Sequence, residues 1–127
     1  MTEYEKMQRG EVYLATDPSL LRELHACQDK CWEYNRLCPT DARRRNEMIR
    51  EILGGADEDT FVNQPFHCDY GKHIFVGKRF FSNFNFTVLD EAQVSIGDDC
   101  FIGPNVSIYT ACHSTDPVER NTRREWA

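Results

Sequence analysis

His113 lies at the end of a six-residue repeat, and a histidine held in a fixed position can act as a base near neutral pH. The repeat consists of consecutive segments that begin at Ile96, Ile102 and Ile108. A rigid support of this kind would hold the imidazole where it could take a proton from a hydroxyl group. The alternative is an ordinary exposed loop histidine, which the spacing alone does not exclude.

Amide and carboxylate side chains elsewhere in the chain are suited to binding hydroxyl groups. Asn83 could donate a hydrogen bond to an oxyanion or hold a hydroxyl, whereas Asn85 better fits a stack of side chains at a corner of a repeated fold. Carboxylates accept hydrogen bonds from hydroxyl groups with charge-assisted strength. The acidic candidates are Asp17, Asp69, Asp90 and Glu91. Asp17 is also a suitable helix cap, and Asp90 is also a candidate for a structural role.

The repeat itself predicts the element that would position His113. A period of six with glycine in the second place is typical of a β-solenoid, in which each hexapeptide forms one short face of a triangular prism. The positions predicted to point inward are Ile96, Cys100, Ile102, Val106, Ile108 and Cys112. A weaker copy begins at Val76, with Phe80, Phe86 and Val88 as further inward candidates. We expect Phe66–Gly71 to be the irregular turn that enters this copy.

The region 1–55 is predicted to be helical. Thr2 begins a capping box at the start of a short helix, and Gly10 would end that helix. Asp17 precedes a proline at the first position of the next helix. A third helix begins at Thr40 or Asp41 and ends at Gly54-Gly55. From residue 61 onward, aromatic and β-branched residues replace the helical pattern. The chain is therefore divided into an N-terminal helical region, 1–55, and a β-helical region, 61–127.

Charge and hydropathy exclude several classes of protein. The net charge is −6, and the short basic run Arg43–Arg45 lies among acidic residues, which indicates a solvated helix face rather than a nucleic-acid site. No apolar run approaches the ~20 residues of a membrane span. The charged start of the chain lacks the core of a signal peptide, so we expect a cytoplasmic protein without membrane contact.

The six cysteines do not form a recognisable metal motif. Cys27 and Cys31 are one helical turn apart and Cys38 follows nearby, so a small metal-binding module is conceivable. The close CxxC pairs typical of zinc sites are absent, however, and a buried thiol can also act as a small apolar residue. We therefore expect no metal.

The chain resembles the hexapeptide-repeat sugar O-acetyltransferases, which include maltose, galactoside and nodulation-factor acetyltransferases. The resemblance runs from end to end and rests on an ordered series of motifs. These motifs are Lys6–Tyr13, Asp17-Pro18, Asp69-Tyr70-Gly71, Asn83-Phe84-Asn85 and Gly103-Pro104-Asn105-Val106, followed by His113. A bare hexapeptide repeat occurs in many acyltransferases, so the ordered series is the more specific signal.

The resemblance implies both a fold and a reaction. The fold would be mainly β, with short α-helices before a left-handed parallel β-helix. The reaction would be direct transfer of an acetyl group from acetyl-CoA to a sugar hydroxyl, with His113 as general base and Asn83 in catalysis and substrate binding. Asp17, Asp69 and Glu91 would contact the sugar. Members of the family are trimers with sites between subunits, so we expect a homo-oligomer.

Members of the family continue beyond the loop after the catalytic histidine with further coils. Those coils supply most of the acetyl-CoA groove and much of the trimer contact. This sequence stops at Trp126-Ala127, so we expect only the first coils of the β-helix. An alternative to an enzyme is a truncated, non-catalytic remnant or scaffold that co-assembles with longer relatives.

Overall fold

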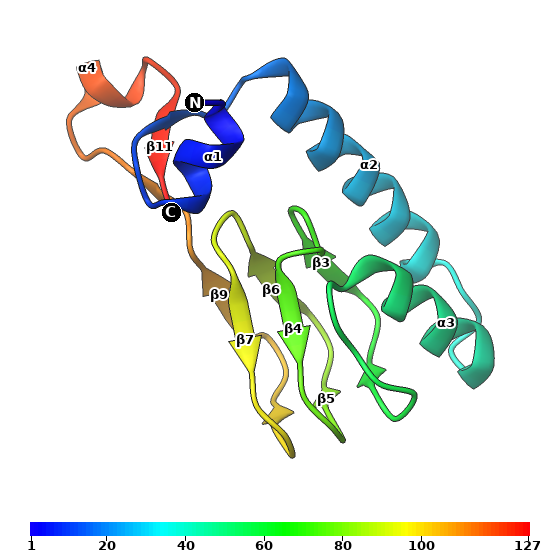
Figure 1. Ribbon diagram of the computed structural model, residues 1–127. Helices are drawn as coiled ribbons and strands as arrows, with labels where there is room; N and C mark the ends of the chain where they lie inside the picture. The colour runs from blue at the N-terminus through cyan, green and yellow to red at the C-terminus, as the bar shows by residue number, and fades with distance from the viewer.

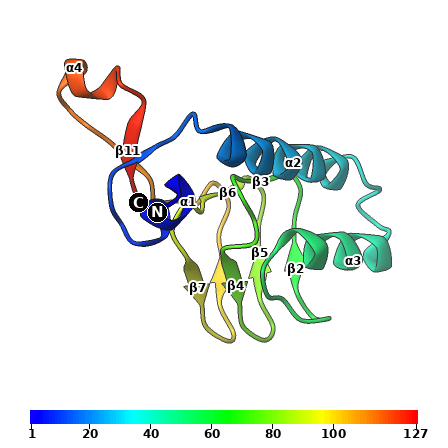
Figure 2. The same ribbon diagram turned by 45° about the horizontal axis from the view of Figure 1, so that its top comes forward.

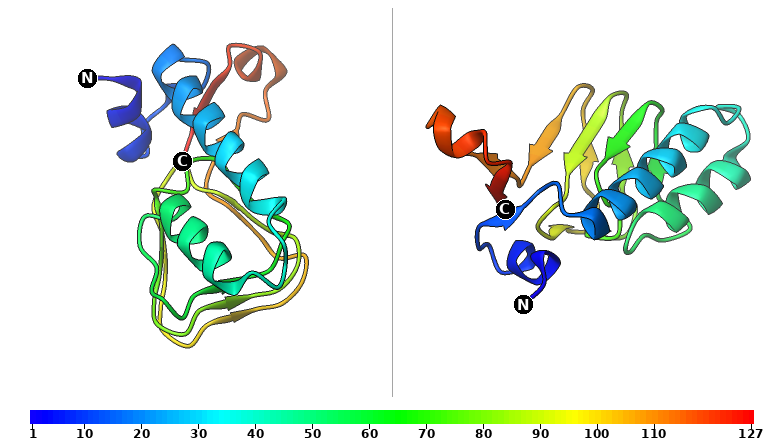
Figure 3. Two further views of the ribbon diagram at one scale, coloured as in Figure 1. Left: turned by 90° about the vertical axis from the view of Figure 1, so that its right-hand side faces the viewer. Right: turned by 90° about the horizontal axis from the view of Figure 1, so that it is seen from above.

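Three stacked coils of short parallel strands form the body of the protein (Figure 1). The computed structural model describes all 127 residues. One face of the prism contains β2 (Phe61–Val62), β5 (Phe81–Ser82) and β8 (Phe101–Ile102). The second face contains β3 (Phe66–Cys68), β6 (Phe86–Leu89) and β9 (Ser107–Tyr109). The third face contains β4 (Ile74–Val76) and β7 (Val94–Ile96). Viewed along the stack, the coils have a triangular outline (Figure 3). The prism expected from the repeat is therefore confirmed.

Apolar residues at the repeat positions fill the prism. The four inward candidates of the weaker copy are all buried, with Val88 fully covered and Phe80 and Phe86 at 1% exposure. The isoleucines of the stronger copy pack against this core but remain partly exposed. Two expectations were wrong. Cys112 is exposed because the chain leaves the prism there, and Phe66–Gly71 contains β3 of an additional first coil.

Stacked side chains hold the corners of the prism in register. Arg79 forms two hydrogen bonds with Asp99, and Asn85 Nδ2 donates to Asn105 Oδ1 at 3.0 Å, each across a separation of 20 residues. All four residues have positive φ angles, which asparagine and aspartate adopt more readily than most other residues. Asn85 therefore has the corner-stacking role expected for it.

The first third of the chain forms α1 (Glu3–Gln8), α2 (Pro18–Asn35) and α3 (Ala42–Ile52). Thr2 and Glu5 form the predicted capping box, and Asp17 caps α2 by accepting from the backbone of Ser19 and Leu20. Asp41 caps α3 in the same way. No helix in the structure has the length and apolar character needed to span a bilayer.

Helices α2 and α3 cover one end of the prism (Figures 2 and 3). Their buried side chains, which include Tyr34 and Ile49, share one core with Phe66 and Ile74 of the first coil. This core requires a correction to the basic run. Arg43 and Arg44 are exposed as expected, but Arg45 is buried and donates to the backbone oxygens of Pro39 and Val62.

The other end of the chain leaves the prism and returns to the N-terminal segment. β10 (Cys112–His113) and β1 (Tyr13–Leu14) both pair with β11 (Arg124–Trp126), so a small antiparallel sheet has the order β1-β11-β10. The connection contains the short helix α4 (Pro117–Arg120), which projects away from the coils (Figure 1). We call residues 114–127 the arm.

The Asp69-Tyr70-Gly71 motif is a tightly constrained turn after β3. Asp90 Oδ1 accepts hydrogen bonds from the backbone of Asp69 and Tyr70 at 3.1 and 2.8 Å. Gly71 has φ +73°, and a Cβ there would lie 2.4 Å from the backbone oxygen of Ile52. Both the backbone conformation and the lack of space require glycine.

Gly71→Ala is therefore expected to lower the free energy of unfolding by about 1–3 kcal/mol, since alanine must adopt a strained conformation and displace the end of α3. Urea denaturation followed by circular dichroism would measure the change. Gly103→Ala is the control, because a Cβ there meets nothing within 4 Å. Equal losses for the two variants would contradict the expectation.

Candidate active site

Tyr13, Glu125 and His113 lie side by side on three neighbouring strands. Glu125 is the register partner of Tyr13 on one side and of His113 on the other. The Tyr13 hydroxyl donates to Glu125 Oε2 at 2.9 Å, and His113 Nδ1 lies 3.3 Å from Glu125 Oε1. The fold thus aligns these side chains as one row across the small sheet, which we call the Tyr13–Glu125–His113 row.

The exposed fraction rises along this row from Tyr13 to His113, so the histidine is the member that a bound substrate can reach. Tyr13 is 1% exposed, and its burial together with the nearby Glu125 carboxylate raises the pKa of its hydroxyl, so Tyr13 remains a donor. The Glu125 side chain is 17% exposed and that of His113 is 60% exposed. Because the carboxylate faces Nδ1, the imidazole is oriented with Nε2 as the atom that can accept a proton from a bound hydroxyl.

His113 opens onto a pocket of about 450 Å³ between the arm and the start of α2. Ala15, Thr16 and Leu21 line one side, and the arm supplies Arg120 and Arg123 among others. Asp17 follows Thr16 directly, and its carboxylate accepts from Ser19, which lowers the pKa of the Asp17 side chain. The structure therefore places Asp17 next to a wall of the same pocket, and its capping role is observed directly.

Asp69, Asp90 and Glu91 form an acidic cluster behind the Tyr13–Glu125–His113 row. Asp90 is fully buried and fixes the turn of Asp69, which agrees with its expected structural role. Glu91 is 6% exposed and its Oε1 atom has no hydrogen-bond partner. Burial is the main cause that raises the pKa of Glu91, and Asp69, Asp90 and Glu125 add to it as nearby negative charges.

Glu91 is thus held in its protonated form in the folded protein. These effects raise its pKa from 4.5 to about 9, so the unfolded chain releases this proton at lower pH than the folded chain does. Between these pH values the unfolded state binds fewer protons, and the free energy of unfolding falls as pH rises. The same protonated carboxyl can donate a hydrogen bond to Asp69 or to a ligand.

Glu91→Gln removes this proton equilibrium and keeps a donor in the same place. We expect the variant to be more stable than the wild type by about 1–3 kcal/mol at pH 8, with the difference disappearing near pH 4. Urea denaturation at the two pH values would measure it. Glu58→Gln, at an exposed position, is the control and should change stability little at either pH. A Glu91→Gln variant with the wild-type pH dependence would contradict the assignment.

Asn83 lies elsewhere on the prism. Its turn precedes β6, whereas His113 follows β9, and β6 and β9 are paired parallel strands of one face. The two residues are consequently beyond opposite ends of that face and do not meet within one chain. The Asn83 side chain accepts from the backbone of Phe84 at 2.8 Å, and its amide nitrogen has no partner in the chain.

His73 and His67 lie outside the Tyr13–Glu125–His113 row. His73 is buried between Tyr4 and Asp90: its Nε2 atom is 3.0 Å from the Tyr4 hydroxyl, and its Nδ1 atom is 2.5 Å from the Asp90 backbone oxygen. This pair of contacts attaches α1 to the prism. His67 is exposed on β3 and does not approach His113.

Comparison with known proteins bears on the family and the fold of the chain. Residues 6–57 match the maltose acetyltransferase hexapeptide capping motif. The chain is 42% identical to nodulation protein L of Rhizobium meliloti over 119 residues, which cover 94% of this chain and 65% of that protein. A maltose O-acetyltransferase structure from Clostridium difficile 630 has a TM-score of 0.96 and 36% identity, and covers all of this chain and 68% of that one. This chain belongs to the hexapeptide-repeat acetyltransferase family.

A further solved structure, a galactoside acetyltransferase in complex with coenzyme A, has a TM-score of 0.94 and 26% identity, and covers all of this chain and 64% of that one. The fold shared with these hexapeptide-repeat acetyltransferases is the left-handed parallel β-helix, as the sequence predicted. The chain spans about two thirds of the length of each of these relatives.

Sequence reasoning missed two members of the site, Glu125 and Tyr13. Glu125 lies in an irregular, highly charged stretch with no periodicity, and Tyr13 lies in a two-residue strand. The pairing of β11 with β10 brings Glu125 to His113, and the pairing of β11 with β1 brings Tyr13 to Glu125 from 112 residues away in the sequence. In this chain, residues of β1 and β11 thus line up with His113 in the Tyr13–Glu125–His113 row.

Proposed function

We propose that this chain carries the base and the acceptor-binding face of an acetyl-CoA-dependent sugar O-acetyltransferase of the maltose or galactoside type. The observation that carries this proposal is the Tyr13–Glu125–His113 row, in which a carboxylate oriented by a buried hydroxyl faces Nδ1 of an exposed histidine. A base oriented by a third group is the arrangement that activates a hydroxyl nucleophile.

The reaction is a direct transfer. As the sugar hydroxyl oxygen attacks the thioester carbonyl carbon of acetyl-CoA, His113 Nε2 takes the hydroxyl proton and the Glu125 carboxylate stabilises the imidazolium that forms. The tetrahedral oxyanion then collapses, the carbon–sulfur bond breaks, and the departing thiolate takes the proton from the imidazolium. Both substrates meet in one site, so no covalent acyl-enzyme is required.

The acidic residues near the row bind the acceptor. Asp17, at the pocket wall, and Asp69, beside the row, accept hydrogen bonds from sugar hydroxyls with charge-assisted strength. Protonated Glu91 can donate a hydrogen bond as well as accept one, whereas the two aspartates only accept. Glu91 would therefore favour acceptor sugars that place an oxygen lone pair toward it. A pocket of about 450 Å³ has room for a sugar ring.

Asn83 joins this site from another subunit. It lies beyond the opposite end of the face from His113, so one chain alone does not unite them, and the arm projects away from the coils (Figure 1). A cyclic homo-oligomer, and specifically a trimer, would bring the Asn83 end of one subunit to the His113 end of the next. The Asn83 amide would then donate to the oxyanion or hold the acceptor.

Release of free thiol from acetyl-CoA by the purified protein tests the proposal. We expect release that depends on an added sugar, with maltose, glucose and a galactoside compared at equal concentration. Sugar-dependent release would support the transferase. A folded chain that releases no thiol with any sugar would support the alternative function, a non-catalytic scaffold that co-assembles with longer relatives.

Glu125→Gln is expected to lower kcat by about 100-fold while the KM for the sugar changes little. The amide cannot stabilise an imidazolium, yet it retains the shape of the side chain. Steady-state kinetics of thiol release would separate the two constants. Tyr13→Phe is the matched variant, and its smaller loss should reflect only the orientation of Glu125. A rise in sugar KM with unchanged kcat would assign Glu125 to binding instead.

A further inference from the structure

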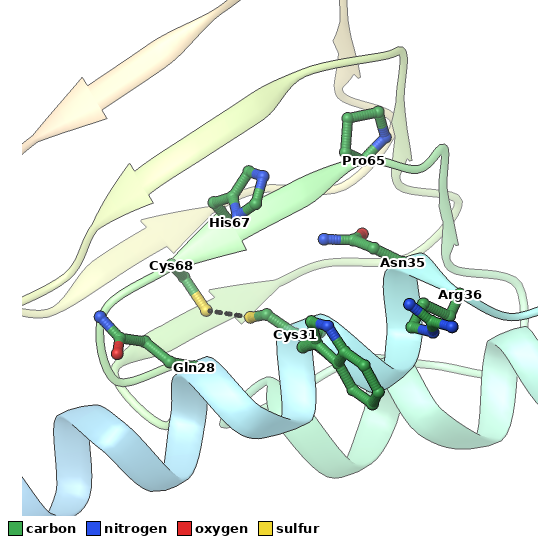
Figure 4. A pocket seen from close by; sticks show the side chains of 8 residues that line it. Gln28, Cys31, Asn35, Arg36, Pro65, His67 and Cys68 are labelled. Atoms are coloured by element: carbon green, nitrogen blue, oxygen red, sulfur yellow. Dashed lines mark hydrogen bonds between the residues drawn. The ribbon is translucent and has the colours of Figure 1, made fainter.

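Three buried cysteines converge between α2 and β3, far from the row that carries His113. Cys27 and Cys31 are one turn apart on α2, and Cys68 lies opposite them at the end of β3. Figure 4 shows Cys68 facing Cys31. The Cys68 Sγ atom is 3.5 Å from that of Cys27 and 3.8 Å from that of Cys31, and all three Sγ atoms lie within 4.8 Å of one another. No disulfide joins them.

These separations match those of sulfur ligands around one metal ion. Two sulfurs bound to a tetrahedral zinc ion at about 2.3 Å lie about 3.8 Å apart. The observed spacing therefore needs little rearrangement to accept a central ion. Simple packing would also bury three small side chains, but it does not require three sulfur atoms to converge from two elements.

The surroundings provide an entry path and room for a fourth ligand. Cys31 and Cys68 line an open pocket of about 490 Å³, together with His67, Asn35 and Arg36 (Figure 4). His67 precedes Cys68 on β3, but its exposed side chain lies on the opposite face of the strand from the Cys68 thiol (Figure 4). A water molecule from the pocket side is therefore the candidate fourth ligand of a four-coordinate site.

We propose that Cys27, Cys31 and Cys68 form a structural binding site for a thiophilic divalent metal ion, with Zn²⁺ as the ion of choice. The bound ion would attach α2 to the first coil of the prism. Each thiol that coordinates the ion releases its proton, and no oxidation or reduction takes place. Cys38, the third cysteine of the module that the sequence suggested, is exposed and contacts Thr40 instead.

Titration of the reduced protein with Cd²⁺, in anaerobic buffer with a phosphine reductant, tests the site. We expect an ultraviolet sulfur-to-cadmium charge-transfer band that saturates at one ion per chain. Zn²⁺ should displace Cd²⁺ and raise the Tm of the protein by about 5 °C or more at saturation. A folded, fully reduced wild-type protein with no saturable band would overturn the proposal.

Two sets of variants separate this site from other thiols. Cys31→Ser and Cys68→Ser should each weaken Cd²⁺ binding by about 100-fold or more, whereas Cys38→Ser and Cys112→Ser, at exposed positions, should leave it unchanged. His67→Gln should leave the band unchanged, as expected for water as the fourth ligand, and a weaker band would overturn the assignment of water. Equal losses in Cys38→Ser and Cys68→Ser would overturn the assignment.

Discussion

His113→Ala is expected to lower kcat for sugar acetylation by about 10²- to 10⁴-fold, the range that a positioned general base contributes. The expected loss is in kcat, because the side chain is 60% exposed at the pocket and acts on the proton of the attacking hydroxyl. The fold should be unaffected, since His113 makes no contact with the prism core. Steady-state thiol release from acetyl-CoA, with and without sugar, would measure the change.

Cys112→Ala is the matched control for this variant. Cys112 precedes His113 on β10 and is likewise exposed, but it has no partner in the row. It should retain wild-type kcat. If His113→Ala retained more than about a tenth of wild-type kcat, the base would have to be sought elsewhere.

Mixing two inactive variants is expected to restore activity. His113→Ala lacks the base and Asn83→Ala lacks the amide, whose loss costs about 10²- to 10³-fold if it binds the oxyanion. In randomly mixed oligomers, a site is complete when its histidine comes from one variant and its asparagine from the other. Each condition holds for half of the chains, so roughly a quarter of the sites should work in the unseparated mixture, and about one site in three in isolated mixed trimers.

The two variants would carry different affinity tags and be refolded together, so that mixed oligomers can be isolated before thiol release is measured. Each variant refolded alone provides the background. Mixed oligomers that show only the background rate would contradict a site shared between subunits, as would a wild-type protein that is active and monomeric.

Much of the fold could be predicted because it depends on local repetition. The inward positions around Phe80 and Val88 follow from a period that every coil repeats, and the caps at Thr2 and Asp17 follow from contacts within a few residues. Cys112 is exposed instead of pointing inward because the backbone there pairs with β11 instead of with the previous coil. Nothing in the six-residue period signals that change of partner.

The site was less predictable because its members meet through distant pairing. His113 could be selected from its place at the end of the repeat, but Glu125 could not be selected from its neighbours. Arg45 shows the same difficulty in the helical region. A basic run normally faces solvent, yet this guanidinium is buried and donates to the backbone oxygens of Pro39 and Val62.

The pairing of Tyr13 with Glu125 has a consequence for how the protein is made. The chain emerges from the ribosome from its N-terminus, and the coils can stack as each is completed, since each contacts mainly its neighbour. The carboxylate that orients His113 is contributed by one of the last strands of the described chain, 112 residues after its tyrosine partner. His113 therefore acquires this orientation only after β11 has been synthesised, so a nascent chain can already have stacked coils while the His113 ring is not yet aligned.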